Sequence, residues 1–416
     1  MTTQEEIIAE IENSHGEVKV DCQDADNPVV SVSFFSHGEV SDEVLALLQR
    51  IDNLQSLAIT VYALPYDGLR HVSKIKSLRL LNLYENGVSG DELVHLSDMT
   101  NLQSLRLDDN SVTDAGLEHL KDLTELRELY LDCNRITDAG LVHLSALTNL
   151  HSLDLSENDV ADTGMEHLKD LTQLRTLHLH ATAVTDAGLE FLTRMTNLQD
   201  LNLNGTRVGD STLERLTGSP KLEKLGLAGT TVTDAGVQHL KGMTKLQSLE
   251  LFHTEFTDAG LQHLIGLNEL RDLQLDETGV TDVGLEHIRG FIKLKTLCLG
   301  KTKITDAGLA NVRGMTNLET LDLSWTKVSD SGLEHIKDLI NLTSLSLSGN
   351  RITETGFAHL TGLTNLQWLH LARLTKAKDV NKLKRALPNC HIDCPAVVET
   401  SLFESVMDFL TGLFRR

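Results

Sequence analysis

The sequence is poor in proline and in aromatic residues, and each shortage excludes a class of protein. Only five prolines occur in 416 residues, and aromatic side chains make up 4% of the chain. Collagen-like and low-complexity chains are excluded, because both have strongly biased compositions that include abundant proline or glycine. Apolar residues still form 40% of the chain, which is enough for an extended hydrophobic core. We therefore predict a folded protein.

Positive charge is scarce relative to negative charge. Lys and Arg total 37 against 60 for Asp and Glu, so the formal net charge is −23. A polyanion would meet a repulsive field over most of such a surface. We therefore expect no nucleic-acid partner.

Export and membrane signals are also missing from the sequence. There is no run of 18 apolar residues, and residues 1–10 lack a basic segment followed by an apolar one. Five cysteines are an odd number in a long chain, which favours free thiols in a reducing compartment. We expect a cytoplasmic protein without a membrane partner.

What the sequence has in abundance is a leucine repeat with a period of 24. Leucine recurs at this spacing without a break at Leu54, Leu78, Leu102, Leu126, Leu150, Leu174, Leu198, Leu222, Leu246, Leu270, Leu294, Leu318, Leu342 and Leu366. Each unit opens L-x-x-L-x-L, an alternation that predicts a short strand with its leucines on one face.

The second half of each unit predicts a helix. The pattern V-T-D-A-G-L-x-H-L is clearest at residues 112–120, 136–144 and 232–240, and its Thr/Asp pair is typical of a helix start. One strand and one helix cannot bury their own apolar faces, so neighbouring units must stack. The predicted fold is an α/β solenoid, a curved horseshoe with a parallel β-sheet on the concave face and helices on the convex face.

On these motifs the sequence resembles the leucine-rich-repeat family over about residues 30–390. The V-T-D-A-G-L helix start resembles the repeats of many bacterial leucine-rich-repeat proteins. It is also similar to the cysteine-containing repeats that follow F-box domains. Those repeats carry cysteine at the turn, whereas here only Cys133 lies near a turn, so the bacterial resemblance is stronger.

Departures from the repeat register indicate the domain organisation. We expect an N-terminal cap of helix plus strand over residues 1–29, a degenerate first repeat over 30–53, the regular array over 54–377 and a C-terminal cap over 378–397. Residues 398–416 form an amphipathic pattern. This segment is expected to cover the last core layer or to pair with a second copy; a membrane surface ranks last, because acids offset its two arginines.

Catalytic and metal-binding motifs are missing from the sequence. We find no G-x-S-x-G, P-loop, H-E-x-x-H or dinucleotide fingerprint. Many histidines share one helix position, a column that tandem duplication explains without metal ligation. The Asp of each helix start is expected to act as a cap, since each unit offers too few oxygens for calcium. We predict no enzyme activity and no catalytic, cofactor or metal site.

Variation between repeats points instead to a binding surface, because the strand positions between the leucines face the concave side. The acids expected there are Glu85, Asp108, Asp109, Glu128, Asp132, Asp154, Glu157, Asp200, Glu250, Asp272, Asp276, Glu277 and Asp322. The bases are only Arg106, Lys224, Lys301 and Arg373. Our candidate partner-binding residues are Tyr84, Arg106, Asp108, Tyr130, Asp132, Asp154, His178, His180, Glu250, Phe252, Asp276, Trp325 and Trp368.

We predict a non-catalytic scaffold whose acidic, aromatic-bearing concave face binds a protein with a basic and partly apolar patch. The alternative is the substrate-recognition subunit of a larger enzyme complex of ubiquitin-ligase or effector type. That alternative requires a docking module, and neither end of the sequence contains a recognisable one. An acidic face that serves only solubility is a further alternative.

Overall fold

The structure is a computed structural model of the whole chain. It describes residues 4–20, 29–35, 40–61, 63–65, 68–372 and 377–393. The chain divides into two compact units, Met1–Leu249 and Glu250–Arg416, which we call unit 1 and unit 2. The amphipathic pattern at 398–416 and Arg373 lie outside the described residues.

Unit 1 begins with a helix and an antiparallel strand pair. Helix α1 (Gln4–Asn13) precedes β1 (Gly16–Val20), which pairs antiparallel with β2 (Val29–Phe35). Helix α2 (Asp42–Leu48) follows, and the Ser41 side chain accepts a hydrogen bond from a backbone N–H of its first turn. These elements lie where the sequence predicts the helix and strand ahead of the array. That they act as a cap stays a prediction.

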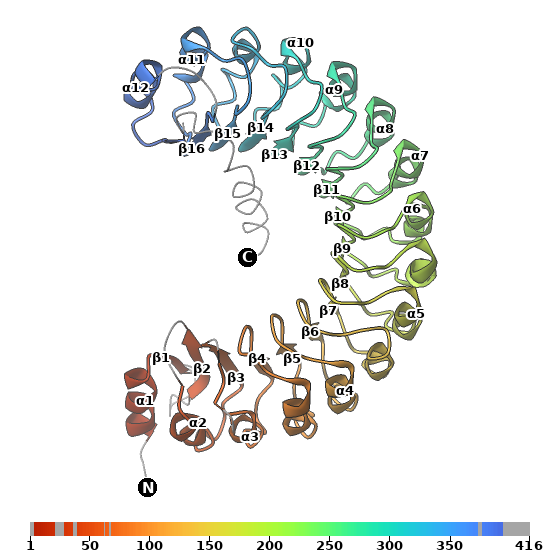
Figure 1. Cartoon of the computed structure of the whole chain (residues 1–416), viewed down its shortest axis with the longest axis vertical. Helices are drawn as coiled ribbons and strands as arrows, with labels where there is room; N and C mark the ends of the chain where they lie inside the picture. The colour runs from red at the N-terminus through yellow and green to blue at the C-terminus, as the bar shows by residue number, and fades with distance from the viewer. Residues whose placement is uncertain are drawn as a thin grey trace. The chain divides into compact units, whose positions relative to one another are not determined.

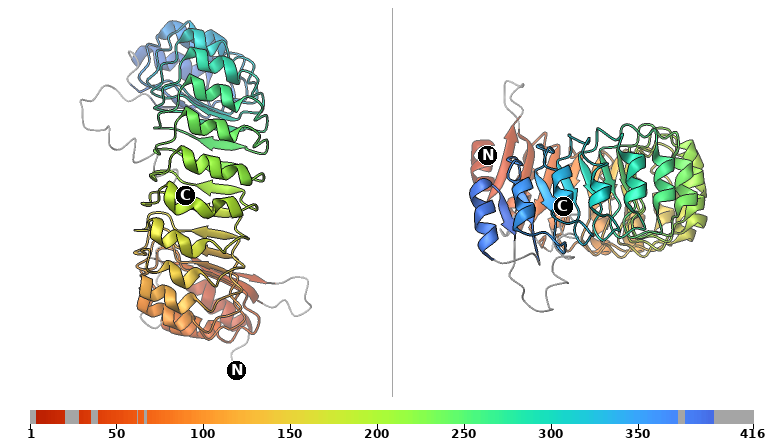
Figure 2. Two further views of the ribbon diagram at one scale, coloured as in Figure 1. Left: turned by 90° about the vertical axis from the view of Figure 1, so that its right-hand side faces the viewer. Right: turned by 90° about the horizontal axis from the view of Figure 1, so that it is seen from above.

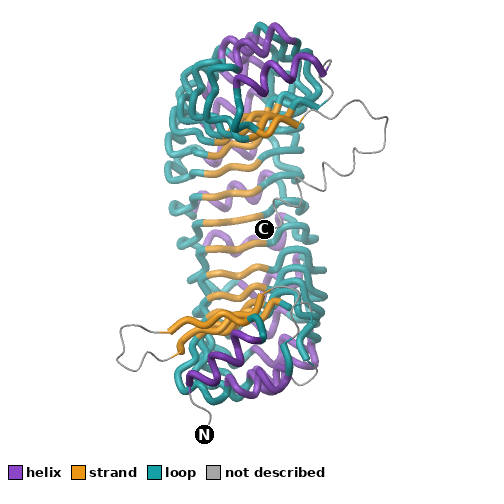
Figure 3. Tube along the Cα trace, turned by 90° about the vertical axis from the view of Figure 1, so that its left-hand side faces the viewer, coloured by secondary structure: helices purple, strands orange, loops and turns teal. Residues whose placement is uncertain are grey.

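Short parallel strands continue the sheet of each unit (Figures 1 and 3). Those of unit 1 are β3 (Ser56–Thr60), β4 (Leu80–Asn82), β5 (Ser104–Arg106), β6 (Glu128–Tyr130), β7 (Ser152–Asp154), β8 (Thr176–His178), β9 (Asp200–Asn202) and β10 (Lys224–Gly226), and β11 (Ser248–Glu250) spans the unit boundary. Those of unit 2 are β12 (Asp272–Gln274), β13 (Thr296–Cys298), β14 (Thr320–Asp322), β15 (Ser344–Ser346), β16 (Trp368–His370) and β17 (His391–Asp393). Leucine pairs with the equivalent leucine of the next repeat, as in Leu105 opposite Leu129, so the sequence period sets the register.

Short helices cover the outer side of each sheet (Figure 2). In unit 1 they are α3 (Gly68–Val72), η1 (Gly90–Leu96), α4 (Asp114–Leu117), η2 (Glu118–Leu120), η3 (Leu141–Leu144), α5 (Asp162–Met165), η4 (Glu166–Leu168), η5 (Asp186–Arg194), α6 (Asp210–Arg215), η6 (Leu216–Gly218), α7 (Asp234–Val237) and η7 (Gln238–Leu240). In unit 2 they are α8 (Asp258–Leu261), η8 (Gln262–Leu264), α9 (Asp282–Ile288), α10 (Asp306–Leu309), η9 (Gly332–His335), α11 (Glu354–Leu360) and α12 (Ala377–Ala386). Many are one α-helical turn followed by a 3₁₀ turn, because the chain must return to the next strand within a single repeat.

The core of each unit lies between its sheet and its helices. The leucines that define the period are at most 1% exposed, from Leu54 to Leu366. A leucine with a fully buried side chain contributes about 1.5–3 kcal/mol. The predicted leucine-rich-repeat solenoid is confirmed, with strands on the inner side and helices on the outer side of each unit.

The T-D-A-G motif ties each repeat to the next. Asp114 Oδ1 accepts the backbone N–H of Thr137 at 2.8 Å, and its Oδ2 accepts the Thr137 hydroxyl at 2.7 Å. The same pair of bonds joins Asp258 to Thr281 in unit 2. The prediction that this Asp caps its own helix is therefore wrong in this detail. The threonine caps the helix, as Thr281 does by accepting the N–H of Val283, while the carboxylate reaches the following repeat.

The glycine of the motif is explained by the same contact. A Cβ at Gly140 would lie 2.5 Å from Asp114 Oδ1 and 3.1 Å from Asp114 Cα. A side chain there would push the two repeats apart, so the Asp–Thr bonds between repeats and the glycine depend on each other.

Candidate functional site

The inner face of each unit is built from two strand positions and one turn position per repeat. In the repeat of β6, Glu128, Tyr130 and Asp132 are at least partly exposed, while the leucines between them are buried. Strands pair in register, so equivalent residues of successive repeats form rows that run across the sheet. We call this surface the inner face.

An arginine links two neighbouring strands on the inner face of unit 1. The Arg106 Nε and Nη2 donate to the two carboxylate oxygens of Asp108 at 3.2 and 3.1 Å. The guanidinium also lies 4.7 Å from the centroid of the Tyr130 ring. Asp108 is 2% exposed, so the two hydrogen bonds from the guanidinium compensate the charge of a carboxylate that has almost no contact with water.

Further along the same face, His178 lies between two aspartates. Its Nδ1 is 3.2 Å from Asp154 Oδ2, and its Nε2 is 3.3 Å from Asp200 Oδ1. Burial of His178 opposes protonation, but the hydrogen bonds to both aspartates outweigh it and raise its pKa to about 9. Asp200 also forms an ion pair with Lys224 at 3.1 Å, so alternating charges continue onto the next strand.

Asp132, at the turn position after β6, is an acid of the same face with a raised pKa. Burial, followed by the charges of Asp154 and Asp108, raises the pKa of Asp132 to about 7. Burial and the nearby Asp109 likewise raise the pKa of Tyr84 to about 12. At neutral pH the tyrosine is therefore a neutral phenol, whereas Asp132 is only partly ionised.

The inner face of unit 2 contains two acids close to each other. Asp276 Oδ1 accepts the backbone N–H of Gly300 at 2.6 Å, and burial together with the charge of Asp322 raises the pKa of Asp276 to about 7. Asp322 Oδ1 accepts the N–H of Ser324 at 2.7 Å, and burial raises its pKa as well. Cys298 pairs with Asp322 in the sheet; burial and these two acids raise the pKa of its thiol well above its usual value.

Two tryptophans of unit 2 are exposed at the inner face, Trp368 at the first strand position of β16 and Trp325 one residue beyond the turn position after β14. Trp325 is 37% exposed, and its ring lies over Gly349, where a Cβ would be only 2.5 Å from the indole. Trp368 is 49% exposed, and its ring centroid lies 4.9 Å from that of His391. Such exposed indoles are typical of binding surfaces.

The structure brings together only some of the predicted partner-binding residues. In unit 1, Arg106, Tyr130, Asp154 and His178 pair across successive strands and form one row. Tyr84 lies beside Asp109, and the His180 ring contacts the backbone oxygen of Asn204 at 3.0 Å. Glu250 ends β11, and Phe252 is half-buried in the following turn. Trp325 and Trp368 come from opposite ends of the strand segment, the turn after β14 and the start of β16.

Three residues that matter to this geometry were not among the predicted partner-binding residues. Asp200 and Lys224 extend the alternating charges beyond His178, and the charge of Asp322 helps to raise the pKa of Asp276. All three were placed on the concave side by the repeat register. The sequence contained a signal for them, because each lies on a strand that is next to, or two strands away from, the strand of a predicted partner-binding residue.

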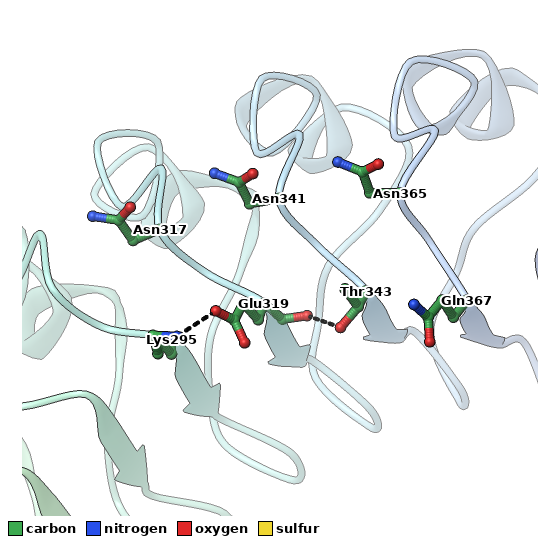
Figure 4. Close-up of a pocket in the computed structure, with 7 residues that line it drawn as sticks. All are labelled: Lys295, Asn317, Glu319, Asn341, Thr343, Asn365 and Gln367. Carbon is green, nitrogen blue, oxygen red and sulfur yellow. Dashed lines mark hydrogen bonds and ion pairs between the residues drawn. The ribbon is translucent and has the colours of Figure 1, made fainter.

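A separate groove of about 490 Å³ lies on the flank of unit 2 (Figure 4). It is lined by Lys295, Asn317, Glu319, Asn341, Thr343, Asn365 and Gln367. The asparagine amides donate to carbonyls of the preceding repeat, and Lys295 forms an ion pair with Glu319 at 2.6 Å. These side chains serve the stacking of repeats. Across the described part of the chain, no three His, Cys, Asp or Glu side chains are arranged to hold a metal ion.

No helix in the described ranges combines the length and hydrophobicity needed to cross a bilayer.

Comparisons with known proteins agree with this architecture. A crystal structure of an internalin from Listeria monocytogenes is 25% identical, with a TM-score of 0.62, and the match covers 89% of this chain and 94% of that one. A leucine-rich-repeat protein of Leptospira interrogans is 22% identical, with a TM-score of 0.60 and coverage of 87% and 88%. The ectodomain of the Arabidopsis receptor kinase HAESA, solved with an extended IDA peptide hormone, is 17% identical, with a TM-score of 0.54 and coverage of 91% and 71%.

The Leptospira and Arabidopsis matches, at 22% and 17% identity, show the fold alone. No curated protein matches the chain. The family described as Leucine-rich repeat region matches residues 31–284, and shorter leucine-rich-repeat descriptions match residues 314–337 and 341–363. With more than half of its length matched in this way, the chain belongs to the leucine-rich-repeat family.

Proposed function

We propose that this protein is a non-catalytic scaffold that binds a partner protein on its inner face. The leucine-rich-repeat fold is widely a protein–protein interaction scaffold, and its members are typically non-catalytic. The observation that carries the proposal is the exposure of both tryptophans, Trp325 and Trp368, on a face rich in acids. Exposed aromatic side chains framed by charge supply the anchors and the polar surroundings that protein interfaces need.

The acids define the chemistry of the partner. Asp132, Asp276 and Asp322 have raised pKa values because burial disfavours their charged forms. A cation from a partner would stabilise those charged forms, and the aromatic side chains would cover apolar surface. We therefore propose a partner with a basic and partly apolar patch, rather than a nucleic acid.

We place this interaction in the cytoplasm. Among the described cysteines, Cys133, Cys298 and Cys390 are free thiols, which suits a reducing compartment. The HAESA ectodomain was solved with a peptide hormone, and at 17% identity this likeness concerns the fold only. No contact in the described residues favours a recognition subunit of an enzyme complex over a simple scaffold.

Affinity purification from the native cell, followed by binding measurements with the purified partner, tests the proposal. We expect Tyr130→Ala and Trp325→Ala each to weaken binding by about tenfold or more, because interface aromatics dominate binding energy. Raising the salt concentration from about 50 mM to about 300 mM should also weaken binding, mainly by slowing association.

The matched control is Lys121→Ala on the outer face, where Lys121 forms an exposed ion pair with Glu118. This variant should bind normally, and all three variants should keep the far-UV spectrum of the parent. A partner whose affinity ignores salt and both aromatic substitutions would contradict the proposal.

A further inference from the structure

The first and last helices among the described residues carry charges of opposite sign. Helix α1 packs on β1 and α2 at the start of unit 1, and α12 packs beside α11 near the end of unit 2 (Figure 1). The sequence of α1 contains four glutamates and no basic residue, whereas that of α12 contains four Lys or Arg residues and one aspartate. Their formal charges are therefore −4 and +3.

The charged side chains of both helices lie outside the core. In α1, Ile7 and Ile11 are buried, while the four glutamates are exposed. In α12, Val380 and Leu383 are buried. The cations exposed on that helix are Lys382, Lys384 and Arg385. Each helix thus presents one sign of charge to the solvent.

Helix stability explains only part of this pattern. The helix dipole favours acids in the first turn and cations in the last turn, which accounts for the first-turn glutamates of α1 and for Lys384 and Arg385 in α12. Glu10 and Glu12 lie in the second half of α1, where the dipole disfavours an acid. These two acids therefore have another cause.

Repeats between the two ends pair charges within their own outer helices. Lys121 and Glu118 are 3.3 Å apart in unit 1, and Lys337 and Glu334 are 3.5 Å apart in unit 2. Within 4.0 Å, no described residue forms an ion pair with these end-helix side chains: Glu5, Glu10, Glu12, Lys382, Lys384 and Arg385. Since a surface of mixed sign is equally polar, solubility alone does not select one sign at each end.

The charge balance of the two units permits an acidic end to approach a basic one. Unit 1 contains 39 acids against 19 Lys and Arg, so its formal charge is −20. Unit 2 contains 21 acids against 18 Lys and Arg, so its formal charge is only −3. The basic helix α12 thus stands on a nearly neutral background, where an acidic helix of another copy meets little repulsion.

Each end also presents the same two layers. Helix α1 and strand β1 begin the helical layer and the sheet of unit 1, and α12 and β17 end those of unit 2. If a second copy continues both layers, α1 lies beside α12 at about 8–10 Å, a distance that Glu and Lys or Arg side chains bridge. Ile11 and Ile392 are at most 8% exposed, so the contact depends on charge and not on core surface.

We propose that the protein associates end to end with a second copy of itself, with the acidic helix α1 of one copy beside the basic helix α12 of the next. The contact is heterologous, so a pair keeps one free α1 and one free α12 and can add further copies. It lies outside the inner face and leaves that face open to the partner protein proposed above.

Sedimentation equilibrium of the full-length chain tests this contact. At about 20 mM NaCl, we expect the weight-average mass to exceed the monomer value of 45.9 kDa and to rise with protein concentration. At about 500 mM NaCl the mass should return to the monomer value, because salt screens contacts between exposed charges.

Charge reversal at either end should abolish the association. E10K/E12K makes α1 neutral, and K382E/R385E gives α12 a charge of −1. Each variant alone should remain monomeric, since neither has end helices of opposite charge. An equimolar mixture should associate again, because α1 of K382E/R385E and α12 of E10K/E12K are unchanged. The mixture offers one such contact per pair, so its mass should stop at twice that of the monomer.

The matched control is K121E/K169E on the outer helices of unit 1, where both lysines form exposed ion pairs. It changes the net charge by the same amount as K382E/R385E and should associate like the parent. Far-UV spectra and urea denaturation check that every variant is folded. E10Q/E12Q, which removes the two charges without reversing them, should also weaken association.

Several results would overturn the proposal. A parent chain that stays at 45.9 kDa at low salt and high concentration has no such contact. Association that persists at about 500 mM NaCl or survives both reversals uses another surface, such as residues 398–416. Failure of the folded variants to associate on mixing, or equal loss in K121E/K169E, would mean that α1 and α12 do not pair. None of these results bears on partner binding at the inner face.

Discussion

A pair of inner-face acids in unit 1 and a pair in unit 2 differ in how their negative charge is compensated. In unit 1, Asp154 and Asp200 share the protonated His178, and Asp108 holds the fork of Arg106. In unit 2, Asp276 and Asp322 face each other without an ion pair among the described residues. Of the acids predicted on the concave side, eight lie in unit 1 and five in unit 2. The two pairs differ in internal compensation, and the pair in unit 2 is the one left with charge to offer a partner.

The aromatic side chains follow the same division. Tyr130 in unit 1 lies under a guanidinium and is half-buried, whereas Trp325 and Trp368 in unit 2 are exposed. The Tyr130 ring thus has a cation–π contact within unit 1. In unit 2, Trp325 lies over Gly349 and Trp368 lies beside His391, yet both indoles remain exposed.

Removing the shared cation should have the largest effect. His178→Ala leaves Asp154 and Asp200 facing each other without compensation, so we expect unit 1 to lose about 2 kcal/mol of stability. This lies below the value for a fully buried pair because the ring is 28% exposed. Urea denaturation at pH 7 measures the loss. His180→Ala is the control, since that ring contacts a backbone oxygen, and an equal loss in both variants would contradict the assigned role.

The pH dependence sharpens the same test. The pKa of His178 is raised from 6.5 to about 9 in the folded protein, so its stabilising effect is complete below pH 6.5 and is lost as the pH rises to about 9. Denaturation curves between pH 6 and 10 should show this decline in the parent. His178→Ala should flatten it, and a decline of the same size in the variant would assign it to other groups.

In unit 2 we expect a substitution on the inner face to increase stability, the opposite of the effect in unit 1. Asp276→Asn should raise stability by about 1 kcal/mol at pH 7.5, because it removes a buried charge and keeps the bond to Gly300. The folded-state pKa is about 7 against 3.8, so the aspartate costs stability increasingly as the pH rises through that window. The gain should therefore disappear near pH 4. Asn204→Asp should destabilise unit 1 at pH 7.5, and a loss of stability in D276N would break the comparison.

A smaller effect should follow from exchanging the cation of the stacked pair. Arg106→Lys keeps the positive charge beside Asp108 but loses the planar fork and the ring contact with Tyr130. We expect a loss of about 0.5 kcal/mol in unit 1, measured by urea denaturation. To separate the two causes, Tyr130 is changed to leucine in both the parent and Arg106→Lys. If Arg106→Lys then causes no loss of stability, the loss came from the ring contact; if the loss is unchanged, it came from the contact with Asp108.

The smallest effect belongs to the outer face. Lys121→Ala removes an exposed i,i+3 ion pair with Glu118 at 3.3 Å, and we expect a change of at most about 0.3 kcal/mol. Thermal denaturation in low and high salt measures it. A larger change would mean that the outer face contributes to the charge balance attributed here to the inner face.

The period of the sequence was sufficient to predict the fold. Leucines one period apart fixed strand register, burial and the stacking of repeats, because each apolar position recurs in the same place. The hydrogen bonds of the T-D-A-G motif were not predictable in the same way. Both Thr and Asp are good cap residues, and only the close approach of Asp114 to Gly140 shows that the carboxylate bonds to the next repeat.

The candidate site was predictable as a surface but not as a set of contacts. Register places Asp154, His178 and Asp200 on adjacent strands, yet rotamers decide whether the imidazole meets one carboxylate, both or neither. Conversely, Asp276 in the turn after β12 and Asp322 on β14 both come close to Gly300, where a Cβ would lie 2.8 Å from Asp276 Oδ1 and 3.5 Å from Asp322 Oδ2. Sequence spacing alone would predict contacts between residues on adjacent strands before contacts between residues that are two repeats apart.

The Asp–Thr hydrogen bonds between repeats also have a consequence for deletions and duplications in this chain. Each bond joins the same two motif positions of successive repeats, Asp114 to Thr137 or Asp258 to Thr281, and each threonine is followed by the aspartate that starts the next link. Excising or duplicating one whole period within a unit rejoins an aspartate to a threonine at the same separation. If the deleted or duplicated segment is one residue shorter or longer than a period, one aspartate carboxylate no longer faces the backbone N–H of its threonine. We therefore expect the gain or loss of a whole repeat within a unit to disturb folding less than the gain or loss of a single residue.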